Sequence, residues 1–305
     1  MKNLFDIVDL STYDNLKFIA EKIVEGFITG LHRSPFHGFS VEFSEHYIYN
    51  QGESTRFIDW KLYARTEKLF VKKFEEETNL RAYIIIDTSS SMFYPVEKKI
   101  INKVGFSIYS AAALIHILQK QRDAVSLFLI SDEAEFISKP RSTKLHINYL
   151  YDQLYNLLNK KDFIGKPTQL AKHLDKYATL FHKRSLIIIF SDLFYFNDME
   201  QIISTFKHLK YYNHEIIVFN TIDYKYEINL DFDNKPYLFI DMETGEKLKL
   251  KPTFFNKEYK EKIDAYRKEL KYKLARYGVE YLDVDIRQHF SQILLPFLLK
   301  RNKMF

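Results

Sequence analysis

The stretch Ala82-Tyr83-Ile84-Ile85-Ile86-Asp87-Thr88-Ser89-Ser90-Ser91 decides the fold of this chain. Its first five residues are apolar and rich in Ile, which is typical of a strand buried on both faces of a parallel sheet. Asp87, Ser89 and Ser91 follow at the carboxyl end of that strand, the edge where open α/β sheets place their ligand sites. Because a carboxylate and two hydroxyls are hard oxygen donors, the pattern favours a small hard cation such as Mg²⁺.

A second strand-like run, residues 186–190, ends in the same way, with Ser191 and Asp192. Between the two runs, the loop 165–168 opens a helical pattern and supplies the hydroxyl of Thr168. Taken singly, Ser191 and Thr168 are better explained as caps of the helices that follow them. Two strands of one sheet, however, bring their carboxyl ends to one crevice. The sequence therefore predicts a site for one Mg²⁺ or Mn²⁺ ion formed by Asp87, Ser89, Ser91, Thr168 and Asp192.

Length and composition limit the class of protein. A chain of 305 residues with 46% hydrophobic residues can bury a large core, and only 8 Gly and 7 Pro argue against disorder. The absence of Cys excludes disulfides, thiolate metal sites and a cysteine nucleophile. No signal peptide and no run of about 20 apolar residues occur, so we expect no membrane span and a cytoplasmic protein.

From residue 82 onward, strand and helix patterns alternate, which predicts an α/β fold with a doubly wound, mainly parallel sheet and helices on both faces. Strands are expected at 82–86, 125–130, 186–190, 215–219 and 279–284. Helices are expected at 97–119, 145–158, 169–181, 198–210, 256–276 and 289–299. An insertion at about 223–252 interrupts this order, and its runs 237–240 and 247–250 flank Glu243-Thr244-Gly245, which predicts a β-hairpin.

The N-terminal part of the chain shows a different pattern of predicted elements. A helical pattern between residues 16 and 31 is followed, after Pro35 and Gly38, by alternation that indicates an extended segment. Residues 69–74 form another candidate strand. We therefore expect an N-terminal segment, 1–80, that packs on a main domain at 81–301.

Charge is unevenly placed along the chain. Residues 247–276 hold 11 Lys and Arg against 4 Asp and Glu, a net charge of +7, so the rest of the chain sums to −2 against a total of +5. Such a stripe can bind nucleic acid. Acidic residues four positions before basic ones favour a solvated helix face instead, as at Glu258–Lys262, Asp264–Lys268 and Glu269–Lys273. Nucleic acid is thus the less favoured partner.

The Asp-x-Ser-x-Ser motif with Thr168 and Asp192 resembles the metal-ion-dependent adhesion site of von Willebrand factor A domains. The chain is more specifically similar to the bacterial family called "domain of unknown function fifty-eight". The similarity extends over about residues 20–301 and lies in residues 37–43 (HGFSVEF), 52–61 (GESTRFIDWK), 74–77 (FEEE), 241–246 (DMETGE) and 294–298 (LLPFL). One departure is the second loop, where Lys166-Pro167 stand in place of the family's paired glycines.

The resemblance implies a non-catalytic binding module. In such sites, Ser and Thr hydroxyls meet the metal, the aspartates act directly or through water, and a partner's carboxylate fills an open position. Relatives are often encoded beside MoxR-type AAA+ ATPases, so the resemblance implies an adaptor in a machine that assembles protein complexes. Longer relatives carry N-terminal membrane helices, and we expect this chain to be the soluble form.

A second constellation within the family-like block is formed by Arg56, Asp59, Trp60 and Arg65. One interpretation makes these residues a second interaction surface ahead of the metal site. The other makes them an Arg–Asp pair and a buried Trp that hold this segment in place, which the usual burial of Trp favours.

The main alternative is an Mg²⁺-dependent phosphohydrolase with Asp87 as its nucleophile. Phosphatases of the haloacid dehalogenase type place a second Asp two residues later as the general acid and base, whereas Ser89 stands there in this chain and cannot do that work at neutral pH. Phosphate-binding loop and His-Glu-x-x-His motifs are also absent from the sequence. The residues therefore favour metal ligation over turnover.

Overall fold

A computed structural model describes residues 16–32, 46–48, 60–66, 68–72, 80–97, 100–160, 165–194 and 199–302. The chain divides into two compact units, Ile28–Asn79 and a larger unit made of Met1–Phe27 with Leu80–Phe305. The larger unit holds the central sheet and every residue of the predicted metal site that the structure describes.

The central sheet has six strands in the order β10-β7-β6-β3-β4-β5. Neighbouring strands are parallel except for the edge strand β5, which runs antiparallel to β4. The strands are β3 (Arg81–Asp87), β4 (Ala124–Ile130), β5 (Ala134–Ile137), β6 (Leu186–Ser191), β7 (Glu215–Ile222) and β10 (Glu280–Asp285). This order reverses direction at β3 and β6, which makes the sheet doubly wound. The predicted α/β fold with a doubly wound, mainly parallel sheet is confirmed.

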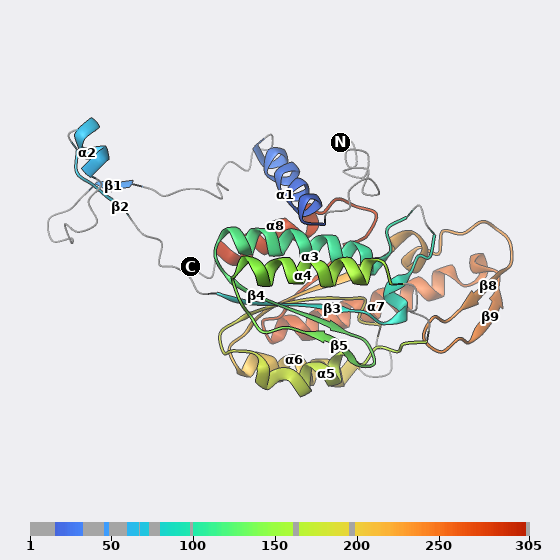
Figure 1. Cartoon of the computed structure of the whole chain (residues 1–305). Coiled ribbons are helices and arrows are strands. Elements are labelled where there is room, and N and C mark those ends of the chain that lie inside the picture. The colour runs from blue at the N-terminus through green and yellow to red at the C-terminus, as the bar shows by residue number, and fades with distance from the viewer. Residues whose placement is uncertain are drawn as a thin grey trace. The chain divides into compact units, whose positions relative to one another are not determined.

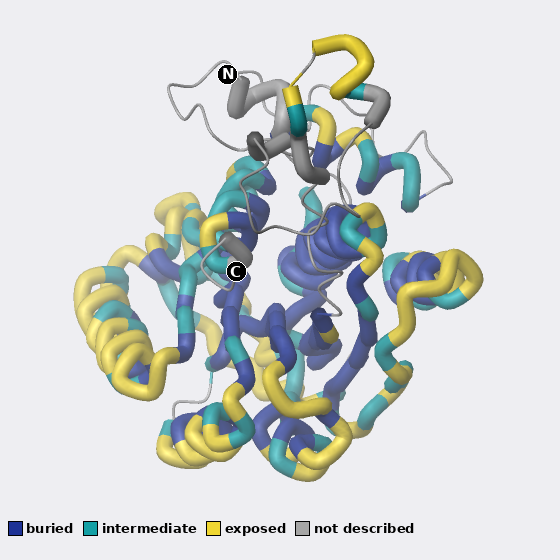
Figure 2. The backbone as a smooth tube through the Cα atoms, turned by 90° about the vertical axis from the view of Figure 1, so that its left-hand side faces the viewer, coloured by how far each residue is buried: buried dark blue, intermediate teal, exposed yellow. Residues whose placement is uncertain are grey.

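Helices cover both faces of the sheet, as the alternating pattern predicts (Figure 1). One face carries α1 (Leu16–His32), α3 (Lys103–Lys120), α4 (Lys144–Leu158) and α8 (Ser291–Asn302), and the other carries α5 (Leu170–Tyr177), α6 (Met199–Tyr211) and α7 (Asn256–Arg276). Because the central strands are enclosed between these layers, they are buried along nearly their whole length, whereas exposed residues gather on the outer sides of the helices (Figure 2). Among the described residues, no helix has the length and apolarity needed to cross a membrane.

The edge strand β5 and the start of α3 differ from the predicted elements. The strand β5 has only four residues and none of them is fully buried, so it leaves no long apolar run in the sequence. The helix expected from residue 97 begins at Lys103 instead. The Asn102 side chain accepts a hydrogen bond from the Gly105 N–H at 2.8 Å, and this cap fixes the start of α3.

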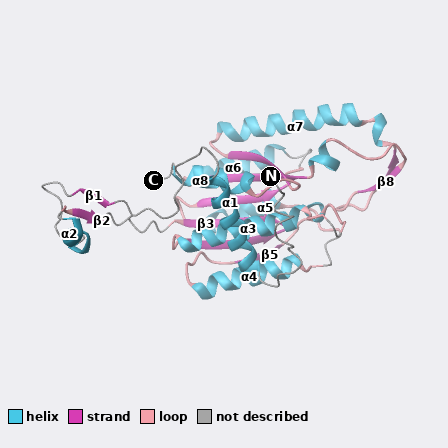
Figure 3. Ribbon diagram, turned by 90° about the horizontal axis from the view of Figure 1, so that it is seen from above, coloured by secondary structure: helices cyan, strands magenta, loops and turns pink. Residues whose placement is uncertain are grey.

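The predicted insertion is a hairpin, formed by β8 (Tyr237–Ile240) and β9 (Lys247–Leu250) in antiparallel register. Gly245 adopts a left-handed conformation with φ of 75° in the connecting turn, which a glycine accommodates without strain. The hairpin lies at the N-terminal end of α7 (Figure 3). Between β7 and the hairpin, Tyr224–Ile228 forms a short π-helix.

The smaller unit contains β1 (His46–Ile48) paired antiparallel with β2 (Phe70–Lys72), together with α2 (Trp60–Thr66). These strands confirm the extended segments expected near residue 47 and within 69–74.

Candidate metal centre

Asp87 is the point at which three separate segments of the chain meet. It is the last residue of β3 and is fully buried. Its Oδ2 atom accepts hydrogen bonds from the Ser191 hydroxyl at 2.7 Å and from the Thr168 hydroxyl at 3.0 Å. Its Oδ1 atom accepts one from the Ser89 N–H at 2.9 Å. The ends of β3 and β6 and the loop before α5 therefore converge on one carboxylate.

The loop that carries Thr168 is held by the serine turn after β3. The Ser90 N–H donates to the Lys166 carbonyl at 2.9 Å, and the Lys166 N–H donates to the Ser90 hydroxyl at 2.7 Å. The Gln169 N–H also donates to the carbonyl of Ser131, which follows β4, at 3.2 Å. Together these bonds position the Thr168 hydroxyl even though Lys166-Pro167 replace the glycines of the related sites.

The two serines of the motif lie beside each other at the same edge of the sheet. Ser90–Phe93 forms a single 3₁₀ turn, and Ser89 precedes it. The Ser89 and Ser91 hydroxyls lie 3.2 Å apart, with Ser89 buried and Ser91 half-buried. The structure thus gathers Ser89, Ser91 and Thr168 around Asp87, as the strand-end argument predicts.

Asp192, the fifth predicted residue, is held by a buried lysine. Lys103 Nζ lies 2.8 Å from Asp192 Oδ2 and 2.6 Å from Glu227 Oε1. Burial disfavours the Lys103 ammonium, but the charges of Asp192 and Glu227 outweigh burial and raise the pKa of Lys103. The other oxygen of Asp192, Oδ1, is buried and has no hydrogen-bond partner.

The balance of charge at this edge is negative. Burial, followed by the negative charge of Asp192, raises the pKa of Asp87 to about 6, although hydrogen bonds from Ser89 and Ser191 oppose the rise. Burial likewise raises the pKa of Glu227 despite its contact with Lys103. A cation would relieve both the repulsion between these carboxylates and the unpaired Oδ1 atom of Asp192.

These donors fit a hard divalent cation. Carboxylate and hydroxyl oxygens are the ligands that Mg²⁺ and Mn²⁺ prefer. Among the residues that the structure describes, no group of three or more His, Asp or Glu side chains is arranged to hold a metal ion. An ion at this edge would therefore depend on the serine and threonine hydroxyls as well as on Asp87 and Asp192.

A carboxylate from the hairpin also reaches the site. Glu243 Oε2 accepts a hydrogen bond from the Thr168 N–H at 3.4 Å, and the Met242 carbonyl accepts one from the Gly165 N–H at 3.1 Å. Burial, followed by the charge of Asp192, raises the pKa of Glu243 to about 7. The turn of the hairpin is thus part of the candidate site.

Sequence reasoning missed Lys103, Glu227 and Glu243. Lys103 had a recognisable signal, because a lysine in the first turn of an apolar helix opposes the helix dipole and calls for an acidic neighbour. Glu243 stands in a family-like block, but only the fold shows that this block meets the loop before α5. We find no sequence signal for Glu227.

The second predicted surface lies largely outside the described residues. Arg56 and Asp59 fall outside them, and Trp60 is described only as the first residue of α2. Arg65 is exposed in the last turn of that helix. An interaction surface formed by these four residues stays a prediction.

The basic stripe is partly neutralised where it forms α7. The predicted pairs Glu258–Lys262 and Glu269–Lys273 are present, at 2.7 and 3.0 Å. Asp264 contacts Arg267 at 3.5 Å rather than forming the expected pair with Lys268. These contacts support a solvated helix face.

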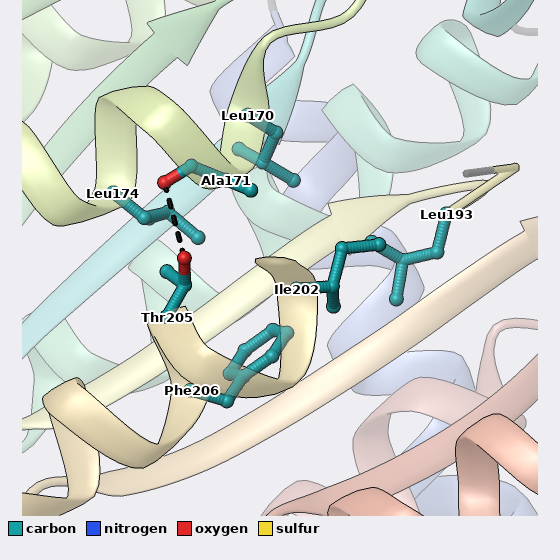
Figure 4. Close-up of a pocket in the computed structure, with 7 residues that line it drawn as sticks. All are labelled: Leu170, Ala171, Leu174, Leu193, Ile202, Thr205 and Phe206. Carbon is teal, nitrogen blue, oxygen red and sulfur yellow. Dashed lines mark hydrogen bonds between the residues drawn. The ribbon is translucent and has the colours of Figure 1, made fainter. Parts of the chain in front are cut away.

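A small apolar pocket between α5 and α6 offers little to a ligand (Figure 4). Its one polar side chain, Thr205, donates to the Asp175 carboxylate at 2.7 Å. The lining residues are Leu170, Ala171, Leu174, Leu193, Ile202, Thr205 and Phe206. We interpret this pocket as imperfect core packing.

The protein has an α/β fold with a doubly wound, mainly parallel sheet, and the candidate site lies at the carboxyl ends of its strands. The chain belongs to the family described as "Protein of unknown function DUF58", whose model matches residues 45–269. The family predicted from the sequence is therefore confirmed. Comparison with curated proteins gives no match.

Among solved structures, BatB from Bacteroides thetaiotaomicron matches with a TM-score of 0.45 and 12% identity, over 74% of this chain and 100% of that one. An aerotolerance-related membrane protein from Bacteroides fragilis matches with a TM-score of 0.43 and 14% identity, over 70% and 99%. The SpRpn10 VWA domain matches with a TM-score of 0.38 and 12% identity, over 70% and 93%.

Proposed function

We propose that this chain is a non-catalytic, divalent-metal-dependent protein-binding module. Asp87, Ser89, Ser91, Thr168 and Asp192 would hold one Mg²⁺ or Mn²⁺ ion, directly or through water. The bound ion would supply a Lewis-acidic position for an acidic side chain of a partner protein. A single partner carboxylate would then serve as the anchor of the complex.

The observation that carries this proposal is the convergence of hydroxyls on the buried Asp87 carboxylate. Ser191 and Thr168 come from different segments, and both donate to the same oxygen. Such a cluster fixes the orientation of the carboxylate and presents neutral oxygens beside it. The unpartnered Oδ1 atom of Asp192 and the negative charge balance support a cation at the same place.

The arrangement favours ligation over turnover. Phosphoryl transfer from a substrate to Asp87, as in phosphatases of the haloacid dehalogenase type, would require a general acid two residues later to protonate the leaving group, and Ser89 stands there. Asp192 and Glu227 raise the pKa of the nearby Lys103 and keep it as an ammonium, so Lys103 cannot act as a general base. A binding role therefore explains these residues better than hydrolysis does.

The proposal extends to the partner. Family members are often encoded beside MoxR-type AAA+ ATPases, so we propose that this module is a cytoplasmic adaptor that acts with such an ATPase in the assembly or maturation of protein complexes. The support for this partner is family membership, and the proposed chemistry requires only that the partner offers an accessible Asp or Glu.

The test is complex formation with the MoxR-type ATPase encoded nearest the gene, measured by analytical ultracentrifugation of purified proteins. Because the ATPase itself uses Mg²⁺, the decisive comparison is between wild type and Asp87→Asn, with no nucleotide present. The proposal predicts a complex with wild type in Mg²⁺, and none with Asp87→Asn or in chelator. A complex that forms equally with Asp87→Asn would overturn the proposed anchor.

A further inference from the structure

The turn of the β8–β9 hairpin is built to hold one side chain at the metal centre. The Asp241 carboxylate accepts hydrogen bonds from the backbone N–H groups of Glu243 at 2.7 Å and Thr244 at 3.0 Å. The Gly245 N–H closes the turn on the Asp241 carbonyl at 2.9 Å. Glu243 is therefore carried on a rigid turn rather than on a freely moving loop.

Contacts with the loop before α5 then fix this turn against the site. The Gly165 N–H donates to the Met242 carbonyl at 3.1 Å, and the Thr168 N–H donates to the Glu243 carboxylate at 3.4 Å. Thr168 is the residue whose hydroxyl contacts Asp87, so one residue contacts both carboxylates.

The hairpin turn brings a third carboxylate to an edge of the sheet that already carries two aspartates. The contacts of Thr168 place Glu243 beside Asp87. Carboxylates gathered in this way repel one another unless a cation lies between them. The buried, unpartnered Oδ1 atom of Asp192 is an independent sign that a positively charged ligand belongs there.

We propose that Glu243 is the chain's own ligand for the open position of the metal centre, so that a partner's carboxylate must displace the hairpin in order to bind. The inference rests on the proposed metal-dependent function and deepens it, because it makes the hairpin an internal competitor of the partner. Partner binding would then release the β8–β9 turn from the loop before α5.

The test uses Mn²⁺ as the probe, because water-proton relaxation by bound Mn²⁺ reports how many exchangeable waters the ion keeps. Wild type, Glu243→Ala and the control Glu246→Ala are each titrated with Mn²⁺. Glu246 is an exposed acid of the same turn, so its removal changes the overall charge equally without removing the proposed ligand. Sodium acetate is then added as a minimal mimic of a partner's carboxylate.

The inference predicts that Glu243→Ala binds Mn²⁺ about tenfold more weakly than wild type and shows higher relaxation per bound ion. Acetate should lower the relaxation in Glu243→Ala by displacing water, and should do so far less in wild type. Equal affinity and equal relaxation in wild type and Glu243→Ala would overturn the inference while leaving the metal site intact. No Mn²⁺ binding by wild type would instead overturn the proposed function itself. The control Glu246→Ala should behave as wild type. If it changes as much as Glu243→Ala does, the effect comes from the loss of a negative charge alone, and the inference is overturned.

Discussion

The Lys103 ammonium lies 2.8 Å from the Asp192 carboxylate, and neither side chain is exposed to solvent. The lysine binds the Oδ2 atom of Asp192, and the Oδ1 atom of the same carboxylate has no hydrogen-bond partner. The proposed divalent ion would therefore have a fixed positive charge near it. Glu227 binds the same ammonium, so Lys103 joins the end of β6 to the π-helix that follows β7. The lysine accordingly has both a structural and an electrostatic effect on the site.

Replacing Lys103 by Met should lower the free energy of unfolding by about 3–5 kcal/mol, because it leaves the buried Asp192 carboxylate and the half-buried Glu227 carboxylate without their lysine partner. Mg²⁺ should stabilise this variant more than wild type, since a competing positive charge is gone. Urea unfolding with and without Mg²⁺ measures both effects.

The matched control is Lys273→Met on α7, which removes a lysine that also contacts two acids, Glu200 and Glu269, but at the surface. This substitution should change the free energy of unfolding by no more than about 1 kcal/mol. If Lys103→Met is no more destabilising than this control, the buried lysine does not hold the site together.

Replacing Thr168 by Val should weaken Mg²⁺ binding about tenfold, because it removes a hydroxyl while keeping the shape of the side chain. The variant also loses the hydrogen bond to Asp87, which contributes about 1.5–3 kcal/mol when the acceptor is charged. Calorimetric titration provides the measurement. Thr168→Ser retains the hydroxyl and should bind nearly as wild type does, so equal weakening in both variants would contradict a role for the hydroxyl.

The stability of the metal-free protein should fall as the pH rises from about 4 to about 7, relative to Asp87→Asn. The pKa of Asp87 is raised to about 6 in the folded chain, so between its unfolded and folded pKa values the folded state binds more protons. Its contribution to stability is thus fully present below the unfolded pKa and is lost as the pH passes the folded pKa. Urea unfolding across this pH range should show that the difference in the free energy of unfolding between wild type and Asp87→Asn changes by a few kcal/mol. Mg²⁺ should reduce the loss of stability of the wild type. If the free energies of unfolding of the two proteins change with pH in parallel, the result would contradict the assigned environment of Asp87.

The basic stripe should not act as a nucleic-acid site. Because Lys262 and Lys273 on α7 pair with acidic neighbours, fluorescence anisotropy with duplex DNA and single-stranded RNA should show no binding at physiological salt. Binding that persists in chelator and falls steeply with added salt would favour the alternative function.

Much of the fold could be predicted because its core strands are continuous apolar runs. Ile84, Ile85 and Ile86 are fully buried in β3, and the Ile-rich run of β6 is buried in the same way, so both leave a clear pattern in the sequence. The edge strand β5 could not be predicted, because a short, half-exposed strand needs no such run. The predicted start of α3 lies too early in the sequence, because the Asn102 cap depends on local geometry rather than on apolar spacing.

The sequence predicts only those parts of the candidate site that lie at the ends of neighbouring strands. Asp87 and Asp192 follow buried strands, and topology alone brings such positions together. The sequence predicts Ser191 as an end-of-strand residue or a helix cap. Its hydrogen bond to Asp87 follows only from the observed register of β3 and β6. Glu227 and Glu243 reach the site from the region after β7, where no periodic pattern fixes the path of the chain.

The most direct test of the central claim is a calorimetric titration of Mg²⁺ into purified wild type and Asp87→Asn, with circular dichroism to show that both proteins are folded. The account predicts saturable binding of one ion by wild type and none by Asp87→Asn. Equal binding by the two folded proteins, or no binding by wild type with either Mg²⁺ or Mn²⁺, would contradict it.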